Sequence, residues 1–80
     1  MLRVRLFGEL RERAGWSERT VEGAHAPTPS QVWEAIAADC GEQPVLPARI
    51  RVAVNQQFAE PTAPLHDGDE VAFLPPISGG

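Results

Sequence analysis

The chain ends in a segment whose residue types suit chemistry at a C-terminal carboxylate, the stretch PPISGG at residues 75–80. Two prolines cannot continue a strand ladder, and they stiffen the exit from the preceding residues. An extended segment of this length reaches up to about 20 Å. Because Gly79 and Gly80 have no side chains, this end fits a narrow channel that leads to buried chemistry. A carboxylate is a poor electrophile, but ATP can convert it into an acyl adenylate, and a sulfur donor can then produce a thiocarboxylate.

The other reactive side chains do not form the pattern of an enzyme active site. Cys40 is the only cysteine and lies on the apolar face of a predicted helix, where a free cysteine is most often a small buried hydrophobic residue. His66 and Asp67 are too few for a metal site with three or four ligands, and we interpret them as part of a turn. The chain contains no lysine, which excludes a Schiff-base lysine. We therefore expect no metal site, no permanently bound cofactor and no catalytic side chain.

The composition predicts one small globular domain. The chain has 80 residues, of which 42% are hydrophobic and 22% are charged. Its net charge of −4 disfavours nucleic acid as a partner, because such partners normally require a basic surface. No apolar run is long enough to cross a bilayer, and no signal-peptide pattern is present, so we expect a cytoplasmic protein without a membrane partner.

The elements that must position the tail follow from hydrophobic periodicity. Alternation predicts strands at residues 1–7, 17–22, 49–54 and 70–74. A short helical turn at 9–15 joins the first two strands, which we expect to form a hairpin, and a short extended piece surrounds Phe58. The main helix starts after Thr28, which forms a capping box with Gln31, and ends at Gly41. We place the folded domain at residues 1–74 and a flexible tail at residues 75–80.

A single main helix covers only one face of the predicted sheet. The residues expected on the covered face are apolar: Leu2, Val4, Leu6, Ile50, Val52, Val54, Val71 and Phe73. The residues expected on the open face form an apolar centre with arginines around it: Arg3, Arg5, Phe7, Arg51, Ala53, Ala72 and Leu74. This composition is typical of a partner-binding surface. An ordinary solvated sheet face with scattered apolar residues explains it equally well at this level.

Three stretches resemble a known family: MLRVRLFGELRERAG at 1–15, VAVNQQF at 52–58 and LHDGDEVAFLPPISGG at 65–80. They are similar to the MoaD group, the small sulfur-carrying subunits of molybdopterin synthase. The likeness covers essentially the whole chain, and its specific part is the D-G-D-E-V-A-F stretch followed by two prolines and Gly-Gly. Residues 16–48 are compatible but not distinctive. The implied fold is the ubiquitin-like β-grasp, an α+β fold with a mixed four- to five-stranded sheet and one main helix on one face.

The resemblance implies a role for the tail. The carboxylate of Gly80 would be adenylated by an E1-like adenylyltransferase that consumes ATP, and a sulfur donor system would then convert it into a thiocarboxylate. Gly79 would enter the partner's active site with Gly80. The tail residues that would lie along the partner are Pro75, Pro76, Ile77 and Ser78.

The resemblance also implies a partner. Sulfur would pass to cyclic pyranopterin monophosphate inside the large catalytic subunit of molybdopterin synthase, which forms the dithiolene of molybdopterin. The two subunits would assemble as a heterotetramer. Phe7 and Leu74 match apolar positions that family members use against partners, and Arg5 and Arg51 join them in the predicted partner-binding surface.

Related carriers serve other pathways. The thiamine-pathway sulfur carriers share the fold and the Gly-Gly end, but they are usually shorter and usually lack a pair like Pro75-Pro76. Other relatives donate sulfur to tRNA thiolation or to cysteine synthesis, or become attached to proteins as ubiquitin-like modifiers. A docking domain that binds through its open sheet face and makes no use of its tail is a further alternative.

Overall fold

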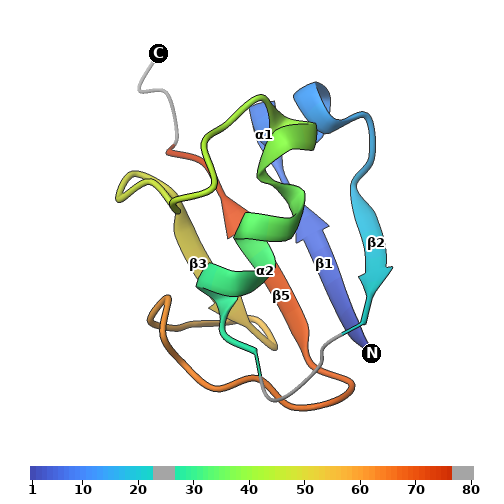
Figure 1. Cartoon of the computed structure of the whole chain (residues 1–80), viewed down its shortest axis with the longest axis vertical. Helices are drawn as coiled ribbons and strands as arrows, with labels where there is room; N and C mark the ends of the chain where they lie inside the picture. The colour runs from blue at the N-terminus through green and yellow to red at the C-terminus, as the bar shows by residue number, and fades with distance from the viewer. Residues whose placement is uncertain (23–26, 77–80) are drawn as a thin grey trace.

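The computed structural model describes residues 1–22 and 27–76, and within them the predicted order of elements is confirmed (Figure 1). The strands are β1 (Leu2–Leu6), β2 (Glu18–Val21), β3 (Arg51–Val54), β4 (Gln57–Phe58) and β5 (Glu70–Leu74). The helices are α1 (Gly8–Ala14), α2 (Pro29–Ile36) and the 3₁₀ helix η1 (Ala37–Cys40). None of these helices is long and apolar enough to cross a membrane.

The described strands form one mixed sheet in the order β2-β1-β5-β3-β4. β1 pairs with β5 in parallel, whereas the β1–β2, β3–β5 and β3–β4 pairs are antiparallel. The predicted hairpin of the first two strands is therefore confirmed. The last described strand, β5, lies in the middle of the sheet between β1 and β3. Residues 75 and 76 therefore continue from the centre of the sheet and not from its edge.

Helix α2 begins as its sequence predicts. The Thr28 backbone N–H donates to the Gln31 side-chain oxygen at 2.9 Å, and the Gln31 backbone N–H donates to the Thr28 hydroxyl at 3.3 Å. Pro29 occupies the first helical turn. The helical segment ends at Gly41, which has the predicted left-handed conformation with φ +68°, but its last four residues tighten into η1.

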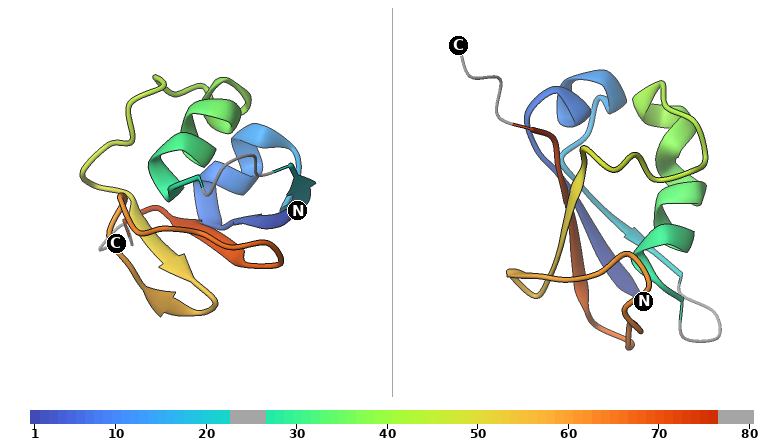
Figure 2. Two further views of the ribbon diagram at one scale, coloured as in Figure 1. Left: turned by 60° about the horizontal axis from the view of Figure 1, so that its bottom comes forward. Right: turned by 90° about the vertical axis from the view of Figure 1, so that its left-hand side faces the viewer.

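The predicted apolar face of this helical segment is buried against the sheet. In the right-hand view of Figure 2, α2 and η1 lie on one side of the sheet, and among the described residues no helix covers the other side. The indole of Trp33 packs on Phe73 with ring centroids 5.2 Å apart, and its N–H donates to the Gln43 carbonyl at 3.0 Å. The helical residues in this core are Val32, Trp33, Ile36, Ala37 and Cys40.

The predicted start of β3 at residue 49 is wrong by two residues. β3 begins at Arg51 rather than Arg49, because a turn closed by the bond from the Ile50 N–H to the Pro47 carbonyl (3.0 Å) precedes it. The turn after β3 contains Asn55 and Gln56, with φ of 50° and 69°, and Gln57 already belongs to β4. Two consecutive left-handed residues match the twist of a two-residue hairpin, which explains why the turn is this short.

The predicted turn at His66 and Asp67, before β5, is confirmed, and the carboxylate of Asp69 stabilises it. The Asp69 N–H donates to the His66 carbonyl at 3.0 Å, and Gly68 adopts φ +90°. The Asp69 carboxylate accepts from the His66 N–H at 2.8 Å, which closes the turn from the other side. Asp67, which the sequence analysis assigns to this turn, pairs with the Met1 amino group.

Candidate functional site

The start of the tail is held against the first helix. β5 ends at Leu74, and Pro75 and Pro76 follow it directly. Gly8 has φ +53°, and a side-chain carbon built on it would come within 3.0 Å of the Pro75 ring. Glycine therefore both allows this backbone conformation and leaves room for Pro75. The predicted tail-insertion residues Ile77, Ser78 and Gly79, and the predicted sulfur-carrying Gly80, lie outside the described residues.

An apolar hollow lies beside this exit on the open face of the sheet. Ala53 and Ala72 are cross-strand partners and are nearly buried, so their small side chains form its floor. Phe7, Leu74 and Phe58 line its sides. Phe58 is 70% exposed, which is unusual for a large aromatic side chain. We name this surface, made of Phe7, Ala53, Phe58, Ala72 and Leu74, the apolar patch.

Arginines stack on the two aromatic rings of the apolar patch. The Arg5 guanidinium lies 5.0 Å from the centre of the Phe7 ring, and the Arg51 guanidinium lies 4.7 Å from the centre of the Phe58 ring. Arg51 is also the cross-strand partner of Leu74. The predicted surface residues Phe7, Arg5, Arg51 and Leu74 thus meet on one face, and their role in binding a partner stays a prediction.

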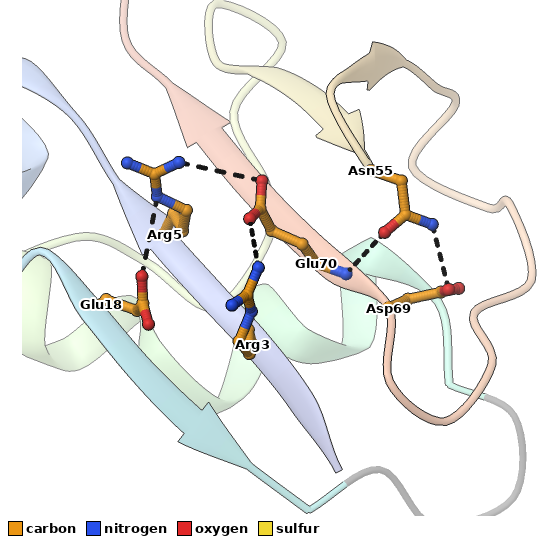
Figure 3. A network of polar contacts seen from close by, with 6 residues as sticks. All are labelled: Arg3, Arg5, Glu18, Asn55, Asp69 and Glu70. Atoms are coloured by element: carbon orange, nitrogen blue, oxygen red, sulfur yellow. Dashed lines mark hydrogen bonds and ion pairs between the residues drawn. The ribbon is translucent and has the colours of Figure 1, made fainter.

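A charged cluster occupies the other half of the open face (Figure 3). Glu70 is only 6% exposed, and its carboxylate accepts from Arg3 at 2.9 Å and lies 3.9 Å from Arg5. Arg5 also lies 3.9 Å from Glu18. We name this set, Arg3, Arg5, Glu18 and Glu70, the charged cluster. Its two arginines and two glutamates balance one another.

Asn55 connects the charged cluster to the turn before β5. Its side-chain oxygen accepts from the Glu70 N–H at 3.0 Å, and its amide donates to Asp69 at 3.0 Å. The N–H of His66 and the Asn55 amide, in that order of importance, lower the pKa of the Asp69 carboxyl. Sequence reasoning missed the position of Glu70, although Glu70, Ala72 and Leu74 alternate along β5 and so share a face.

Sequence reasoning also missed Phe58. A two-residue strand gives no periodicity from which to assign a face, and the assignment follows only from its pairing with Ala53. The turn at Asn55 and Gln56 directs this short strand back beside β3. The feature that points to Phe58 is therefore the register of the hairpin, which the sequence alone does not reveal.

Cys40 lies in the core, as predicted, and not on the open face. Burial raises the pKa of its thiol, and the neighbouring carboxylates of Asp39 and Glu42 raise it further. A thiol with a raised pKa is a weak nucleophile at neutral pH. Among residues 1–22 and 27–76, no three or more His, Cys, Asp or Glu side chains are grouped so that they could hold a metal ion.

The chain resembles known proteins along its full length. The model of the ThiS family matches residues 4–80. The molybdopterin synthase sulfur carrier subunit of Escherichia coli (strain K12) is 35% identical over 82 residues, which cover 100% of both chains. The protein with the same name from Chlamydomonas reinhardtii is 39% identical over 84 residues, covering 99% of this chain and 98% of that protein.

A solved structure has the same fold at lower sequence identity. The crystal structure of SAMP1 from Haloferax volcanii, the small archaeal modifier protein 1 of that organism, superposes with a TM-score of 0.83 at 26% identity. The match covers 99% of this chain and 98% of SAMP1. The predicted ubiquitin-like β-grasp is therefore confirmed.

Proposed function

The chain belongs to the ThiS family, and we propose that it is the sulfur carrier subunit of molybdopterin synthase. The observation that carries the proposal is the similarity to two proteins of that name, which covers 100% of this chain for one and 99% for the other. The position of Pro75 and Pro76 at the end of the central strand supports it, because the tail then starts from a strand that is paired on both sides.

The chemistry that we propose takes place at the carboxylate of Gly80. An oxygen of this carboxylate attacks the α-phosphorus of ATP on an E1-like adenylyltransferase, and pyrophosphate leaves. A hydrosulfide equivalent from a sulfur donor then displaces AMP, so that a thiocarboxylate remains. Its sulfur is transferred to cyclic pyranopterin monophosphate, and Gly80 returns to a carboxylate when water replaces the sulfur.

We assign the catalytic side chains of the sulfur transfer to the large subunit. This chain would dock on that subunit and deliver the sulfur. The apolar patch would rest on that subunit next to the tail, and residues 75–80 would enter its active site. The burial of Cys40 supports this division, because a buried thiol is poorly placed to act on a substrate of the complex. A heterotetramer and a cytoplasmic location are part of the same proposal.

The mass of the intact protein tests the proposal. After incubation with ATP, a molybdopterin synthase activating enzyme and a sulfur donor, we expect the mass to rise by the replacement of one oxygen by sulfur, mapped to Gly80. The loaded protein and the large subunit should then convert cyclic pyranopterin monophosphate. An unchanged mass would contradict the proposal.

Two tail variants provide the matched controls. Deletion of Gly80, or addition of one residue after it, should abolish sulfur transfer because the reactive carboxylate is displaced. Neither change touches the described core, so the thermal unfolding midpoint should stay the same. Sulfur transfer by the deletion variant would rule out a role for Gly80 and favour a docking domain that makes no use of its tail.

The similarity to SAMP1 favours a second candidate, a protein modifier whose C-terminus becomes joined to amines of other proteins. It predicts amide-linked adducts ending in Gly79-Gly80 on lysines of cellular proteins, detectable by mass spectrometry after purification through a tagged chain. The lack of lysine in this chain means that it cannot form lysine-linked chains of itself. A purification without such adducts would count against this candidate.

A further inference from the structure

The arginines of the open face differ in how their charge is balanced. In the charged cluster, Arg3 lies 2.9 Å from Glu70, and Arg5 lies 3.9 Å from both Glu18 and Glu70. At the edge of the apolar patch, Arg51 has no carboxylate within 4.0 Å of its guanidinium among residues 1–22 and 27–76. Within the part of the chain that the structure describes, Arg51 is therefore the arginine of the open face whose charge no nearby carboxylate balances, although the whole chain has a net charge of −4.

The position of Arg51 suits the binding of a carboxylate from another protein. Its guanidinium stacks on the Phe58 ring, which restricts the side chain without using its N–H groups. A guanidinium in this arrangement can donate two parallel hydrogen bonds to one carboxylate. Arg51 is exposed, and the apolar patch beside it would exclude water from such a pair when a partner covers the face.

Arg51 also lies next to the tail. Its cross-strand partner is Leu74, the residue before Pro75, and Arg51, Phe58, Leu74, Pro75 and Pro76 line one hollow. A carboxylate bound there would therefore belong to the protein that receives the tail. The nearby Arg49 is paired with Glu42 at 2.6 Å, so its charge is already balanced.

We propose that Arg51, stacked on Phe58, binds an acidic side chain of the large subunit at the mouth of the channel that receives the tail. This inference rests on the proposed function and adds the chemistry of the contact: an Asp or Glu of the partner, placed beside an apolar surface that covers Leu74 and Phe58. Arg3 and Arg5 contribute little to the attraction, because Glu18 and Glu70 already neutralise them.

The test measures the affinity of the full chain for the purified large subunit at low and at physiological ionic strength. We expect Arg51→Glu to weaken binding at least about tenfold at low salt, because a like charge then faces the partner's carboxylate. Arg51→Lys should weaken binding less, since it keeps the charge but loses the planar fork. Raising the ionic strength should lower the rate of association with the large subunit more for the wild type than for Arg51→Glu.

Arg11→Glu is the matched control. Arg11 is exposed on α1, which packs against η1 rather than lying on the open face, and its reversal changes the net charge of −4 by the same two units. We expect its affinity to stay within about twofold of the wild type. Both variants should keep the thermal unfolding midpoint of the wild type, because both side chains are exposed.

A charge swap identifies the partner's residue. Large-subunit variants in which one surface Asp or Glu near the tail channel is replaced by Arg should include one that restores binding to Arg51→Glu. Wild-type affinity of Arg51→Glu, or an equal loss in Arg11→Glu, would overturn the inference and leave the proposed function intact. If the wild-type chain itself neither binds the large subunit nor supports dithiolene formation, the proposed function fails, and this inference fails with it.

Discussion

Phe73 and Leu74 are neighbours in β5, but they lie on opposite faces of the sheet and in different surroundings. Phe73 is fully buried and packs against Trp33 under the helical segment. Leu74 is half-buried on the open face, next to the aromatic side chain of Phe58 and the first proline of the tail. The same alternation separates Val71, which is fully buried in the core, from Glu70, which binds Arg3 on the open face.

The difference between the two faces indicates that stability and recognition can be changed separately. The helical segment packs on the covered face, so a substitution there changes the free energy of unfolding. No described segment covers the apolar patch of the open face, where Phe58 is 70% exposed. Substitutions in the patch should therefore act on partner binding and leave the fold in place.

The largest expected effect is on the covered face. Phe73→Ala removes a buried ring and leaves a cavity next to Trp33, so we expect the free energy of unfolding to fall by about 3–5 kcal/mol. Urea unfolding measures this loss, with Leu74→Ala as the neighbouring control, for which we expect less than about 1 kcal/mol. If Phe73→Ala does not fold, Phe73→Leu should show a smaller loss of the same origin. Equal losses at both positions would remove the distinction between the faces.

The next effect is on the open face. Leu74→Glu places a charge in the surface that the partner would cover, and we expect the affinity for the large subunit to fall about 30-fold, corresponding to about 2 kcal/mol. The unfolding midpoint should change little, since the new carboxylate faces its cross-strand partner Arg51. Calorimetric titration and thermal unfolding of the same samples measure both quantities. Unchanged affinity would place the interface elsewhere.

A smaller effect is expected in the charged cluster. Glu70→Gln keeps the shape of the side chain but removes the charge that holds Arg3 and Arg5, and we expect a loss of about 1 kcal/mol of unfolding free energy. Binding of the large subunit should be retained, because the apolar patch is unchanged. Urea unfolding and the binding assay above test both statements. A large loss of affinity with normal stability would make the charged cluster part of the contact itself.

The smallest effect concerns the turn at Asp69, and it depends on pH. Because the folded state lowers the pKa of this carboxyl, its contribution to stability is fully present above the unfolded pKa of about 4 and is lost as the pH falls through the lower folded value. Asp69→Asn should therefore be less stable than the wild type at about pH 7, and the difference should shrink below about pH 4. Urea unfolding of both proteins across this pH range tests the sign of the pH dependence. A difference that does not change with pH would contradict the assignment.

The fold was largely predictable because its signals are local. The alternation in residues 1–7 and 70–74, and the capping box at Thr28, each need only a few consecutive residues, and the structure contains the corresponding elements. The apolar face of the main helix was predicted correctly for the same reason: its residues recur at helical spacing.

The candidate site was less predictable because it depends on pairing between distant strands. The position of Phe58 follows from a two-residue turn of left-handed Asn55 and Gln56, residues that seldom adopt this conformation together. The burial of Glu70 follows from its position beside β1, whose arginines are far away in the sequence. The assignments of residues 75–80 as a tail and of Gly80 as its reactive end stay predictions, based on the resemblance and on the chemistry of the residues.

The central position of β5 also determines when the domain can fold. β1, made first, has β5 as its parallel neighbour, and β3 pairs with the other side of the same strand. Contacts between the two ends of a chain make folding slow, because a long loop must close before they form. During synthesis, the sheet therefore cannot be completed until residue 74 has left the ribosome. A chain interrupted within β5 would expose the edges of both β1 and β3, and such unpaired edges favour aggregation and degradation.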